Sequence, residues 1–532
     1  MELFKLQDLI FGGEPTRAEL AAFQAEGAVT HRVAVYRNHS FELVQKTIAP
    51  FCAFAGINVE FNYSDYDDSL SFADLDTSVD LVIVWVDATR YKIDNVTQFL
   101  AERIKFLSSS YSGRILLAVL GEKIDTPMAT ILDLSRIEAN MGRDFIDMRM
   151  EPYSGTKLSA KACMAVSREL GLNYLPVLLG VPLKGIIVDL DNTLYKGVLG
   201  EDGIQGVELT QGHIALQQHL KRFSQQGLFL GIASKNDEID VRKLLEERDD
   251  FPLKPNDFAY IKANWNDKSE SIQEIADLLN IHPSSLLFID DNLGEIVSVL
   301  ERHRNIKTIW ARDDADITAR ALAEFPGLLK LAINKEDRLR KADVLANKER
   351  ENLKSSLSKD DYIKSLQIEV TYSVNELSHS NRVAELANKT NQFIFSYQRY
   401  TYQQICNLMN ANDSAVVSIS MKDKLSDSGI IGVIVVRAND ELATLEECFV
   451  SCRALGRGLD EVIVLGAVQS ALTALKRTAL SVLFVDGERN APARKFCDTY
   501  LSGYIERKQS FEYIYPDGLV DLKFEKGKED AR

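Results

Sequence analysis

Several runs of apolar residues in this sequence end abruptly in polar turns, and this pattern constrains the fold more than any other feature. Residues 80–86 (DLVIVWV) and 114–121 (RILLAVLG) are continuous apolar runs, the pattern of strands buried on both faces. Residues 185–194 (GIIVDLDNTL), 228–236 (LFLGIASKN) and 286–292 (LLFIDDN) begin in the same way and finish in polar or acidic residues. Helical segments separate these runs. Because buried strands that alternate with helices form parallel sheets, the sequence predicts an α/β fold.

The chain of 532 residues is expected to contain about three domains at roughly 150 residues each. The alternating pattern predicts a parallel, flavodoxin-like α/β domain followed by a doubly wound α/β domain. Residues 334–366 are rich in charged residues, alanine and leucine, which indicates an exposed helical connector rather than a flexible linker. Strand-like segments followed by a long helix then indicate an α+β domain with a mixed sheet. The predicted boundaries are 1–181, 182–325, 326–365 for the connector, and 366–532.

The composition excludes several classes of protein. The formal net charge is −16, which disfavours binding along a nucleic-acid backbone, because phosphates need a positive surface. No run approaches the ~20 apolar residues of a membrane helix, and the N-terminus lacks the pattern of a signal peptide. The six cysteines form no CxxC pair and the seven histidines are dispersed, so neither a disulfide framework nor a zinc site is expected. We therefore expect a cytoplasmic protein with reduced thiols.

Four carboxylates follow two of the buried strands. Asp189 and Asp191 end one strand, and Asp290 and Asp291 end another. The carboxyl ends of parallel strands form the ligand-binding edge of an open sheet, so these acids are expected to converge. Since converging carboxylates repel each other, a hard cation such as Mg²⁺ is expected between them. One aspartate would then attack phosphorus, and another, two residues on, would exchange a proton with the leaving group.

Three further polar residues belong to the same predicted edge. Ser234 and Asn236 follow the strand between the two acidic ones, and Lys268 begins a helix. Ser234 as a hydrogen-bond donor and Lys268 as a point charge are suited to phosphoryl oxygens. Lys262 is an alternative for the lysine, although Lys268 has the better position at a helix start.

The order of these motifs resembles the haloacid dehalogenase (HAD) superfamily of aspartyl phosphotransferases. The matching segments are IIVDLDNT for hhhDxDxT, LGIAS for hhhhS, a lysine, and LLFIDD for hhhhDD, where h is apolar. The resemblance implies that Asp189 is the nucleophile, that Asp191 is the general acid and base, and that Thr193 orients Asp191. The residues that it implies for phosphate are Ser234, Asn236 and Lys268. The residues that it implies around Mg²⁺ are Asp189, Asp191 through its backbone carbonyl, Asp290 and Asp291, and which of the last two is the direct ligand stays open.

The spacing of the motifs indicates how open the predicted site is. The segment from Thr193 to residue 228 has room for a flap and one helix, and the segment from Ser234 to Lys268 has room for one helix and a connector. Neither segment holds a full cap domain. We therefore expect a Rossmann-like HAD core without a large cap, in which the flanking domains influence the choice of substrate.

Longer stretches resemble the FkbH-like branch of that superfamily, subfamily IIIC. They are DLDNTLYKGVLGEDG, ANWNDKSESI and FIDDN in the middle domain, and NKTNQF, QRYT and SCRALGRG in the last domain, within residues 182–505. The resemblance implies a small phosphorylated acid of the glyceryl phosphate type as substrate, such as 1,3-bisphosphoglycerate, and an acyl carrier protein that receives the acyl unit. Other members are associated with surface-polysaccharide biosynthesis, so a plain phosphatase without acyl transfer is the alternative.

A glycine-rich turn in the last domain resembles the acyl-CoA loop of GNAT acyltransferases. Its residues are Arg453, Gly456 and Gly458 in RALGRG, and Asn490 lies in a segment that resembles a later helix of that fold. Backbone N–H groups at such a turn can hold a pyrophosphate, so CoA or a phosphopantetheine arm is the implied ligand. Many GNAT enzymes place a tyrosine general acid where this chain has Cys497, which argues against acetyl transfer by that route.

Whether a thiol carries the acyl group is left open by the sequence. Many glyceryl-loading relatives have a cysteine four residues before the nucleophilic aspartate, where this chain has Gly185. The middle domain contains no cysteine, and Cys452, beside the glycine-rich turn, is the only cysteine inside a motif. If no thiol takes the acyl group, the chain is a phosphatase or passes its product directly to a partner.

The first domain stands where SGNH-hydrolase-like domains precede FkbH-like units. Asn38, His39 and Ser40 occupy the place of the nucleophile block without Gly-Asp-Ser, and the later block at Asp147 has no histidine. Because a serine triad needs an imidazole base, we expect a non-catalytic docking or capping module. A third hypothesis for the whole chain is a binding or scaffold protein with a degenerate site, which the complete set of HAD motif residues disfavours.

Overall fold

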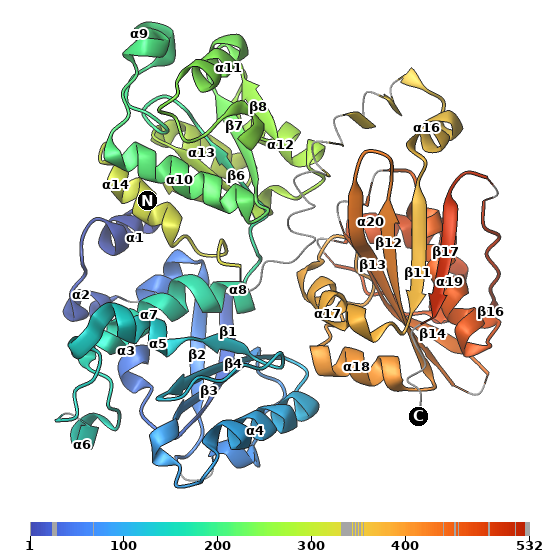
Figure 1. Ribbon diagram of the computed structural model, residues 1–532, viewed down its shortest axis with the longest axis horizontal. Helices are drawn as coiled ribbons and strands as arrows, with labels where there is room; N and C mark the ends of the chain where they lie inside the picture. Colours follow the sequence, from blue (N-terminus) through green and yellow to red (C-terminus); the bar gives the residue numbers. More distant parts are fainter. Residues whose placement is uncertain are drawn as a thin grey trace. The chain divides into compact units, whose positions relative to one another are not determined.

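Figure 1 shows the computed structural model of the chain. It describes residues 2–23, 29–66, 69–149, 151–330, 356–439, 441–451, 457–487, 490–516 and 518–526, together with 343, 346, 349–350, 353–354 and 454–455. The chain divides into two compact units, residues 1–278 with 282–333, and residues 279–281 with 334–532. The first unit contains two parallel sheets and the second a mixed sheet, so the predicted multi-domain α/β class is confirmed. None of the described helices combines the length and the apolar character that crossing a membrane requires.

The first sheet is parallel throughout, with the strand order β2-β1-β3-β4-β5. Its strands are β1 (Val29–Arg37), β2 (Ile57–Tyr63), β3 (Leu81–Asp87), β4 (Arg114–Leu120) and β5 (Thr130–Leu132). Helix α4 (Val96–Ser110) covers one face of this sheet. The helices on the other face are α3 (Glu42–Phe54), α5 (Leu134–Met141), α7 (Ala160–Glu169) and α8 (Leu175–Leu179). Every residue of β3 is buried, as the continuous apolar run predicted.

The second sheet is also parallel, with the order β10-β9-β6-β7-β8. Its strands are β6 (Gly185–Val188), β7 (Phe229–Ser234), β8 (Tyr260–Ala263), β9 (Leu286–Asp290) and β10 (Lys307–Trp310). Its helices are α9 (Leu199–Gly206), α10 (Gln211–Gln225), α11 (Glu238–Glu247), α12 (Lys268–Leu278), α13 (Leu293–Arg302) and α14 (Ala315–Ala323). Residues 182–325 are all described, and they contain no inserted domain, so the expected core without a large cap is what the structure has.

The N-terminal helix and α3 share one hydrophobic core with the second sheet. Helix α1 (Glu2–Phe11) packs against β10, where the Gln7 amide donates to the Trp310 carbonyl at 2.8 Å and accepts from the Trp310 N–H at 3.1 Å. Phe54 of α3 contacts Phe325 edge to face, with ring centroids 5.5 Å apart. One cluster of buried side chains includes residues from both sides of the predicted boundary at 181. The individual domain boundaries therefore stay proposals.

The sheet of the second unit has seven strands in the order β16-β15-β14-β13-β12-β11-β17. Its strands are β11 (Glu369–Val374), β12 (Ser414–Lys422), β13 (Asp427–Ala438), β14 (Ala443–Val450), β15 (Ala479–Val482), β16 (Gln509–Ser510) and β17 (Asp521–Lys526). Only the pairs β14–β15 and β11–β17 are parallel. Helices α17 (Ser380–Lys389) and α18 (Tyr402–Asn410) pack on one face. The other face carries α19 (Asp460–Leu475) and α20 (Ala491–Phe496).

Several elements are absent from the sequence interpretation or lie outside the described residues. Strands β8 and β10 are four residues long and each includes a lysine, so neither is a continuous apolar run. Residues 521–526, which the sequence interpretation assigned to no strand, pair with β11 as an edge strand. Most of the predicted connector at 334–366 lies outside the described residues, and its end forms helix α16 (Lys359–Leu366). The sequence is therefore least informative about very short strands and about pairing between strands that lie far apart in the sequence.

The shared core predicts how the first unit unfolds. Phe54→Ala is expected to lower the free energy of unfolding by about 3–5 kcal/mol, because it removes a buried ring and leaves a cavity between the two sheets. Urea denaturation measured by far-UV circular dichroism and by tryptophan fluorescence tests this, since Trp85 and Trp310 belong to different sheets. Phe106→Ala is the control, because Phe106 is 47% exposed, and it should cost about 1 kcal/mol or less. Equal losses for the two variants would contradict the shared core.

Candidate active site at the edge of the second sheet

The predicted acids lie where the connections of the second sheet change direction. From β6 the chain continues through β7 and β8 on one side, then returns to β9 and β10 on the other side. Open α/β sheets bind ligands in the crevice at such a switch point, outside the carboxyl ends of the strands. Asp189 follows β6 and Asp290 ends β9, so the two residues lie on either side of this crevice.

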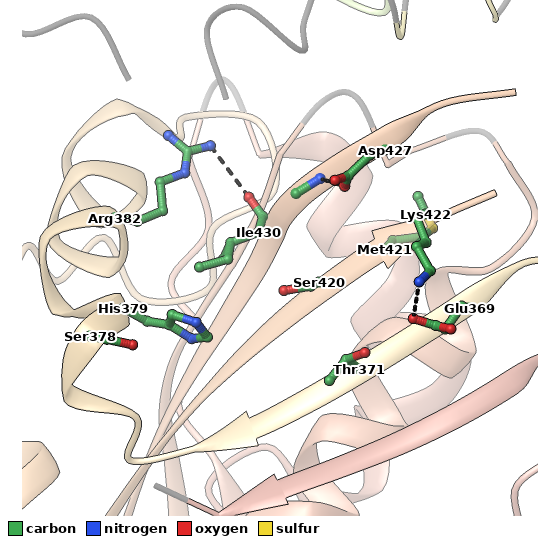
Figure 2. A pocket seen from close by; sticks show the side chains of 11 residues that line it. Glu369, Thr371, Ser378, His379, Arg382, Ser420, Met421, Lys422, Asp427 and Ile430 are labelled. Atoms are coloured by element: carbon green, nitrogen blue, oxygen red, sulfur yellow. Dashed lines mark hydrogen bonds and ion pairs between the residues drawn. The ribbon is translucent and has the colours of Figure 1, made fainter. Parts of the chain in front are cut away.

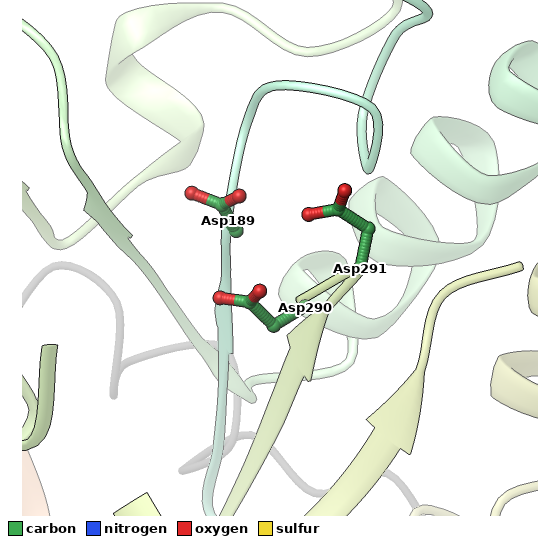
Figure 3. A group of neighbouring side chains, drawn as sticks. All are labelled: Asp189, Asp290 and Asp291. Atoms are coloured by element: carbon green, nitrogen blue, oxygen red, sulfur yellow. The ribbon is translucent and has the colours of Figure 1, made fainter. Parts of the chain in front are cut away.

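Three of the predicted acids come together around one lysine. Figure 3 shows the carboxylates of Asp189, Asp290 and Asp291 turned toward a common space, and an oxygen of each lies within 4.8 Å of the others. Lys268 Nζ lies 3.0 Å from Asp189 Oδ1 and 2.6 Å from Asp290 Oδ2. Asp189, Asp290 and Lys268 are all buried. Three of the four acids that were expected to converge therefore lie together beside Lys268, and their chemical roles stay predictions.

Burial and repulsion shift the pKa values of this group. Burial raises the pKa of Asp189, although the charge of Lys268 and a hydrogen bond from Ser234 act in the opposite direction. Burial and the charge of Asp189 raise the pKa of Asp290 to about 7 and also raise the pKa of Asp291. Burial by itself lowers the pKa of Lys268, but the two neighbouring carboxylates more than offset this effect, and its pKa is raised. The single positive charge of Lys268 therefore does not fully offset the negative charge of the three carboxylates.

The donor set of this cluster fits a magnesium ion. Three carboxylates converge and all have raised pKa values, which means that the site disfavours their negative charge without an added cation. Mg²⁺ prefers oxygen ligands and is usually held by one or two carboxylates together with phosphate and water. Asp189, Asp290 and Asp291 would hold it here. The Asp191 carboxylate does not belong to this group.

The carboxylate of Asp191 is held by hydrogen bonds on both oxygens. Its Oδ1 accepts from the Tyr195 hydroxyl at 2.6 Å and from the Leu199 N–H at 3.0 Å, and its Oδ2 accepts from the Asn236 amide at 3.0 Å. Burial and the charge of Asp191 raise the pKa of Tyr195, so the phenol remains a donor. The Thr193 hydroxyl, expected to orient Asp191, is buried and makes no hydrogen bond among the described residues. The role that we predicted for Thr193 is therefore filled by these three donors.

Ser234 and Asn236 connect the two catalytic candidates. The Asn236 amide donates to Ser234 Oγ at 3.1 Å as well as to Asp191, so it links β7 to the acidic turn after β6. Ser234 in turn hydrogen-bonds Asp189. Asn236 was predicted to bind phosphate, and in the structure its amide N–H groups are bonded to protein oxygens. No sequence pattern indicated that Asn236, Tyr195 and Leu199 would meet at Asp191, because their contacts depend on how the turn folds back.

The structure separates the two candidate lysines. Lys262 of β8 forms an ion pair with Glu274 at 2.7 Å, and its side chain is 28% exposed. Lys268 is the first residue of α12 and lies against the acids, with 7% of its side chain exposed. The preference for Lys268 as the lysine of this site therefore agrees with the geometry.

The predicted acyl-binding residues of the second unit are only partly described. Cys452, Arg453 and Gly456 lie outside the described residues. Gly458 precedes α19 with a φ of 77°, a conformation that glycine adopts most readily. The buried Asn490 amide donates to the Ile394 and Val485 carbonyls at 3.1 and 2.9 Å, and it accepts from the Gly487 N–H at 3.0 Å. These bonds give Asn490 a structural function, and acyl binding by this turn stays a prediction.

Four of the five described cysteines are buried and poor nucleophiles. Burial raises the pKa of Cys52, Cys163 and Cys497 to about 12 each, and burial raises the pKa of Cys448 well above its usual value. A Cβ atom at Gly185 would lie 2.9 Å from Leu286 Cδ2, so this position in β6 has no free space for a side chain. The sequence difference at Gly185 therefore coincides with a tightly packed strand.

The serine-hydrolase block of the first sheet forms no triad among the described residues. The Ser40 hydroxyl donates to the Glu42 carboxylate at 2.6 Å, and His39 Nδ1 lies 2.9 Å from the Thr156 hydroxyl. Asp147 forms an ion pair with an exposed arginine. A serine nucleophile needs an imidazole within hydrogen-bond reach, and Ser40 is bonded to an acid instead. These contacts support a non-catalytic first domain.

Comparisons with known proteins give matches to solved structures only, since no family model and no curated protein matches the chain. The N-terminal part of a Bacteroides fragilis protein, with a phosphatase domain complexed with Mg, is 19% identical, with a TM-score of 0.45 over 62% of this chain and 99% of that one. A HAD family enzyme of Bacteroides thetaiotaomicron, in complex with magnesium and inorganic phosphate, is 14% identical, with a TM-score of 0.18 over 25% and 95%. A ribosomal-protein-alanine N-acetyltransferase of Brucella melitensis is 11% identical, with a TM-score of 0.19 over 28% and 99%. At these scores the likenesses assign no function.

The two lysines provide a matched pair of variants. Lys268→Met is expected to lower the free energy of unfolding by about 3–5 kcal/mol without Mg²⁺, because it leaves two buried carboxylates without their counter-charge. Lys262→Met should cost about 1 kcal/mol or less, because its ion pair is partly exposed. Chemical denaturation with and without Mg²⁺ measures both effects, and Mg²⁺ should restore part of the loss only in Lys268→Met. Similar losses in the two variants would argue against Lys268 as the main counter-charge.

The buried His39 predicts a loss of stability in acid. Burial lowers the pKa of His39 to about 3, whereas a histidine in the unfolded chain has a pKa of roughly 6.5. The unfolded chain binds the proton first, so this contribution is fully present above about pH 6.5 and falls as the pH drops toward 3. Between pH 7 and pH 5 the loss should be about 2 kcal/mol, measured by urea denaturation at both values. His39→Asn should show a smaller pH dependence, and an unchanged one would contradict the assignment.

Proposed function

We propose that the chain is a Mg²⁺-dependent phosphohydrolase of the HAD type that works through an aspartyl-phosphate on Asp189. The observation that supports this most strongly is the different setting of two aspartates in one turn. Asp189 faces Lys268 and two further acids, while three hydrogen-bond donors hold Asp191. Phosphoryl transfer through a covalent intermediate needs two groups. One is a nucleophile beside a positive charge, and the other is a general acid and base that is held in position.

In the first step an oxygen of Asp189 attacks the phosphorus of the substrate, and the bond from phosphorus to the leaving oxygen breaks. Protonated Asp191 gives its proton to the leaving oxygen, and the first product departs. Lys268 and Ser234 hold the non-bridging phosphoryl oxygens as negative charge develops on them. A bound Mg²⁺ supplies positive charge beside Asp189, which allows an anionic phosphate to approach an anionic nucleophile.

In the second step water attacks the phosphorus of the aspartyl-phosphate. Asp191, now ionised, takes a proton from this water, the phosphorus–oxygen bond to Asp189 breaks, and inorganic phosphate is released. Tyr195, Leu199 and Asn236 keep the Asp191 carboxylate in one position for both proton transfers. The enzyme then returns to its starting protonation state.

The FkbH-like motifs support a finer proposal for the substrate and the partner. The substrate would be a small acid of the glyceryl phosphate type that carries both a phosphate ester and an acyl phosphate, such as 1,3-bisphosphoglycerate. Asp189 would remove the ester phosphate as above. The thiolate of CoA or of the phosphopantetheine arm of an acyl carrier protein would attack the acyl carbon, so that a thioester forms and the acyl phosphate leaves as inorganic phosphate. The glycine-rich turn at Gly458 before α19 is the segment proposed to receive that arm. The middle domain, the carrier and the last domain would then act in sequence on one acyl group.

A plain phosphatase without acyl transfer is the alternative, and the cysteines favour it. The described cysteines with shifted pKa values are buried and protonated at neutral pH, and none lies in the middle domain. Cys452 lies outside the described residues, so a thioester on it depends on experiment alone. In this alternative the phosphate is removed as above and the acid or alcohol diffuses away.

Asp189→Asn tests the proposed chemistry. Phosphate release from p-nitrophenyl phosphate and from acyl phosphates with Mg²⁺ should fall by about 10³-fold or more, because the amide cannot form the covalent intermediate. Asp240→Asn is the control, since Asp240 is an exposed acid on α11, and it should keep full activity. Release that persists in Asp189→Asn would overturn the mechanism, and no release by the wild-type chain would favour a scaffold protein.

Intact-mass spectrometry distinguishes acyl transfer from simple hydrolysis. The chain is incubated with 1,3-bisphosphoglycerate, Mg²⁺ and a carrier protein that has its phosphopantetheine arm. Loading of the carrier by wild type and by Cys452→Ser would exclude both the plain phosphatase and a thioester on Cys452. Phosphate release without any loaded carrier would favour the plain phosphatase.

A further inference from the structure

A pocket of about 370 Å³ lies in the second unit, beside helix α17 and strands β11, β12 and β13. Figure 2 shows Ser378, His379 and Arg382 on the helix side and Thr371, Ser420 and Lys422 on the strand side. Pockets for small molecules span roughly 300–1,000 Å³, so this one suits a small ligand. None of the motifs singled out in the sequence contributes to its lining.

Arg382 is buried in this pocket with unused hydrogen-bonding capacity. Its side chain is 9% exposed, and Nη1 forms an ion pair with Glu385 at 2.7 Å. Nη2 donates to the Ile430 carbonyl at the long distance of 3.4 Å, and the buried Nε has no hydrogen-bond partner among the described residues. Leaving a buried donor unpaired costs roughly 1–3 kcal/mol, so such a donor in a pocket wall indicates a missing acceptor.

Other uncommitted polar groups face the same pocket. His379 Nδ1 is bonded to the Ser418 hydroxyl at 2.8 Å, and its other ring nitrogen makes no hydrogen bond among the described residues. The Thr371 and Ser420 hydroxyls, on neighbouring strands, are likewise uncommitted within the described chain. Helix α17 has ten residues and begins without a side-chain cap, so its first turn adds a positive potential.

The acidic groups around the pocket are already engaged. Glu369 pairs with Lys422 at 2.8 Å and also with Lys523. Asp427 accepts from the Gly429 N–H at 2.8 Å. The uncommitted groups are thus an arginine, an imidazole and two hydroxyls, which together complement an anionic acceptor with several oxygens.

We propose that this pocket binds a small organic molecule through a carboxylate or phosphate group placed on Arg382. The anion accepts from the guanidinium of Arg382, and the ring of His379, which lines the same pocket, supplies a further donor. The hydroxyls of Ser420 and Thr371 contact the remaining polar groups of the ligand. This site is distinct from the acidic cluster of the second sheet and from the glycine-rich turn before α19.

Histidine NMR on the full chain tests the proposal. The protein is labelled with ¹³C-histidine, the His379 signal is assigned with His379→Gln, and inorganic phosphate or malonate is added at constant ionic strength. We expect a saturable shift of the His379 signal with at least one of the two anions and none with chloride. Saturation by phosphate alone or by malonate alone identifies the class of anion, and no saturable shift with either overturns the proposal.

Arg382→Gln should weaken this binding at least tenfold, because it removes the guanidinium. Arg437→Gln is the matched control, since Arg437 lies on β13 in an exposed ion pair with Glu446, and it should bind as wild type does. If Arg382→Gln does not fold, Ser420→Ala is the deciding variant, and we expect its affinity for the anion to fall threefold or more. Unchanged binding in the variant that decides overturns the proposal.

Discussion

The contact of one buried lysine with two buried aspartates is the interaction on which the site of the second sheet depends. Lys268 lies 3.0 Å from Asp189 and 2.6 Å from Asp290, and without its charge two carboxylates would face each other at low dielectric. Even with Lys268 present, the pKa values of Asp189, Asp290 and Asp291 remain raised. The fold therefore maintains an excess of negative charge at the switch point of the sheet, which a dication would relieve.

This arrangement is possible because the sheet is held rigidly from both sides. Strands β6 and β9 are central and fully buried, and buried side chains of neighbouring helices pack against them. Helix α1 and Phe54 of α3 pack into the core of the second sheet, and both parallel sheets belong to one compact unit. Ser40 is bonded to Glu42 and His39 to Thr156, so these two side chains do not contact each other's polar groups in a triad arrangement.

The second unit combines two features with different chemical character. The turn before α19 ends with Gly458 in a left-handed conformation, which glycine adopts most readily. The pocket beside α17 instead presents side chains, with Arg382 buried and incompletely bonded. If both sites are used, the unit would recognise a carrier arm at one place and an anionic group at another.

Local patterns in the sequence were enough to predict the fold class and the acids that meet at the edge of the second sheet. Apolar runs that end in Asp189 or Asp290 specify buried parallel strands, and parallel strands place their carboxyl ends at one edge, so Asp189, Lys268, Asp290 and Asp291 could be expected to meet. Short strands such as β8 and the pairing of β17 with β11 could not be expected, because they depend on partners distant in sequence.

The tertiary structure alone decided how Asp191 is held and what surrounds Arg382. The contacts of Asp191 with Tyr195, Leu199 and Asn236 exist because the turn after β6 folds back against β7, and no spacing rule encodes that geometry. Arg382 is an ordinary helix residue in the sequence, and it becomes a site candidate only when β12 and β13 bury it. The types of residue and their spacing along the sequence determine the strands and the acids that follow them. The hydrogen-bond partners and the unpaired donors depend instead on packing between segments that lie far apart in the sequence.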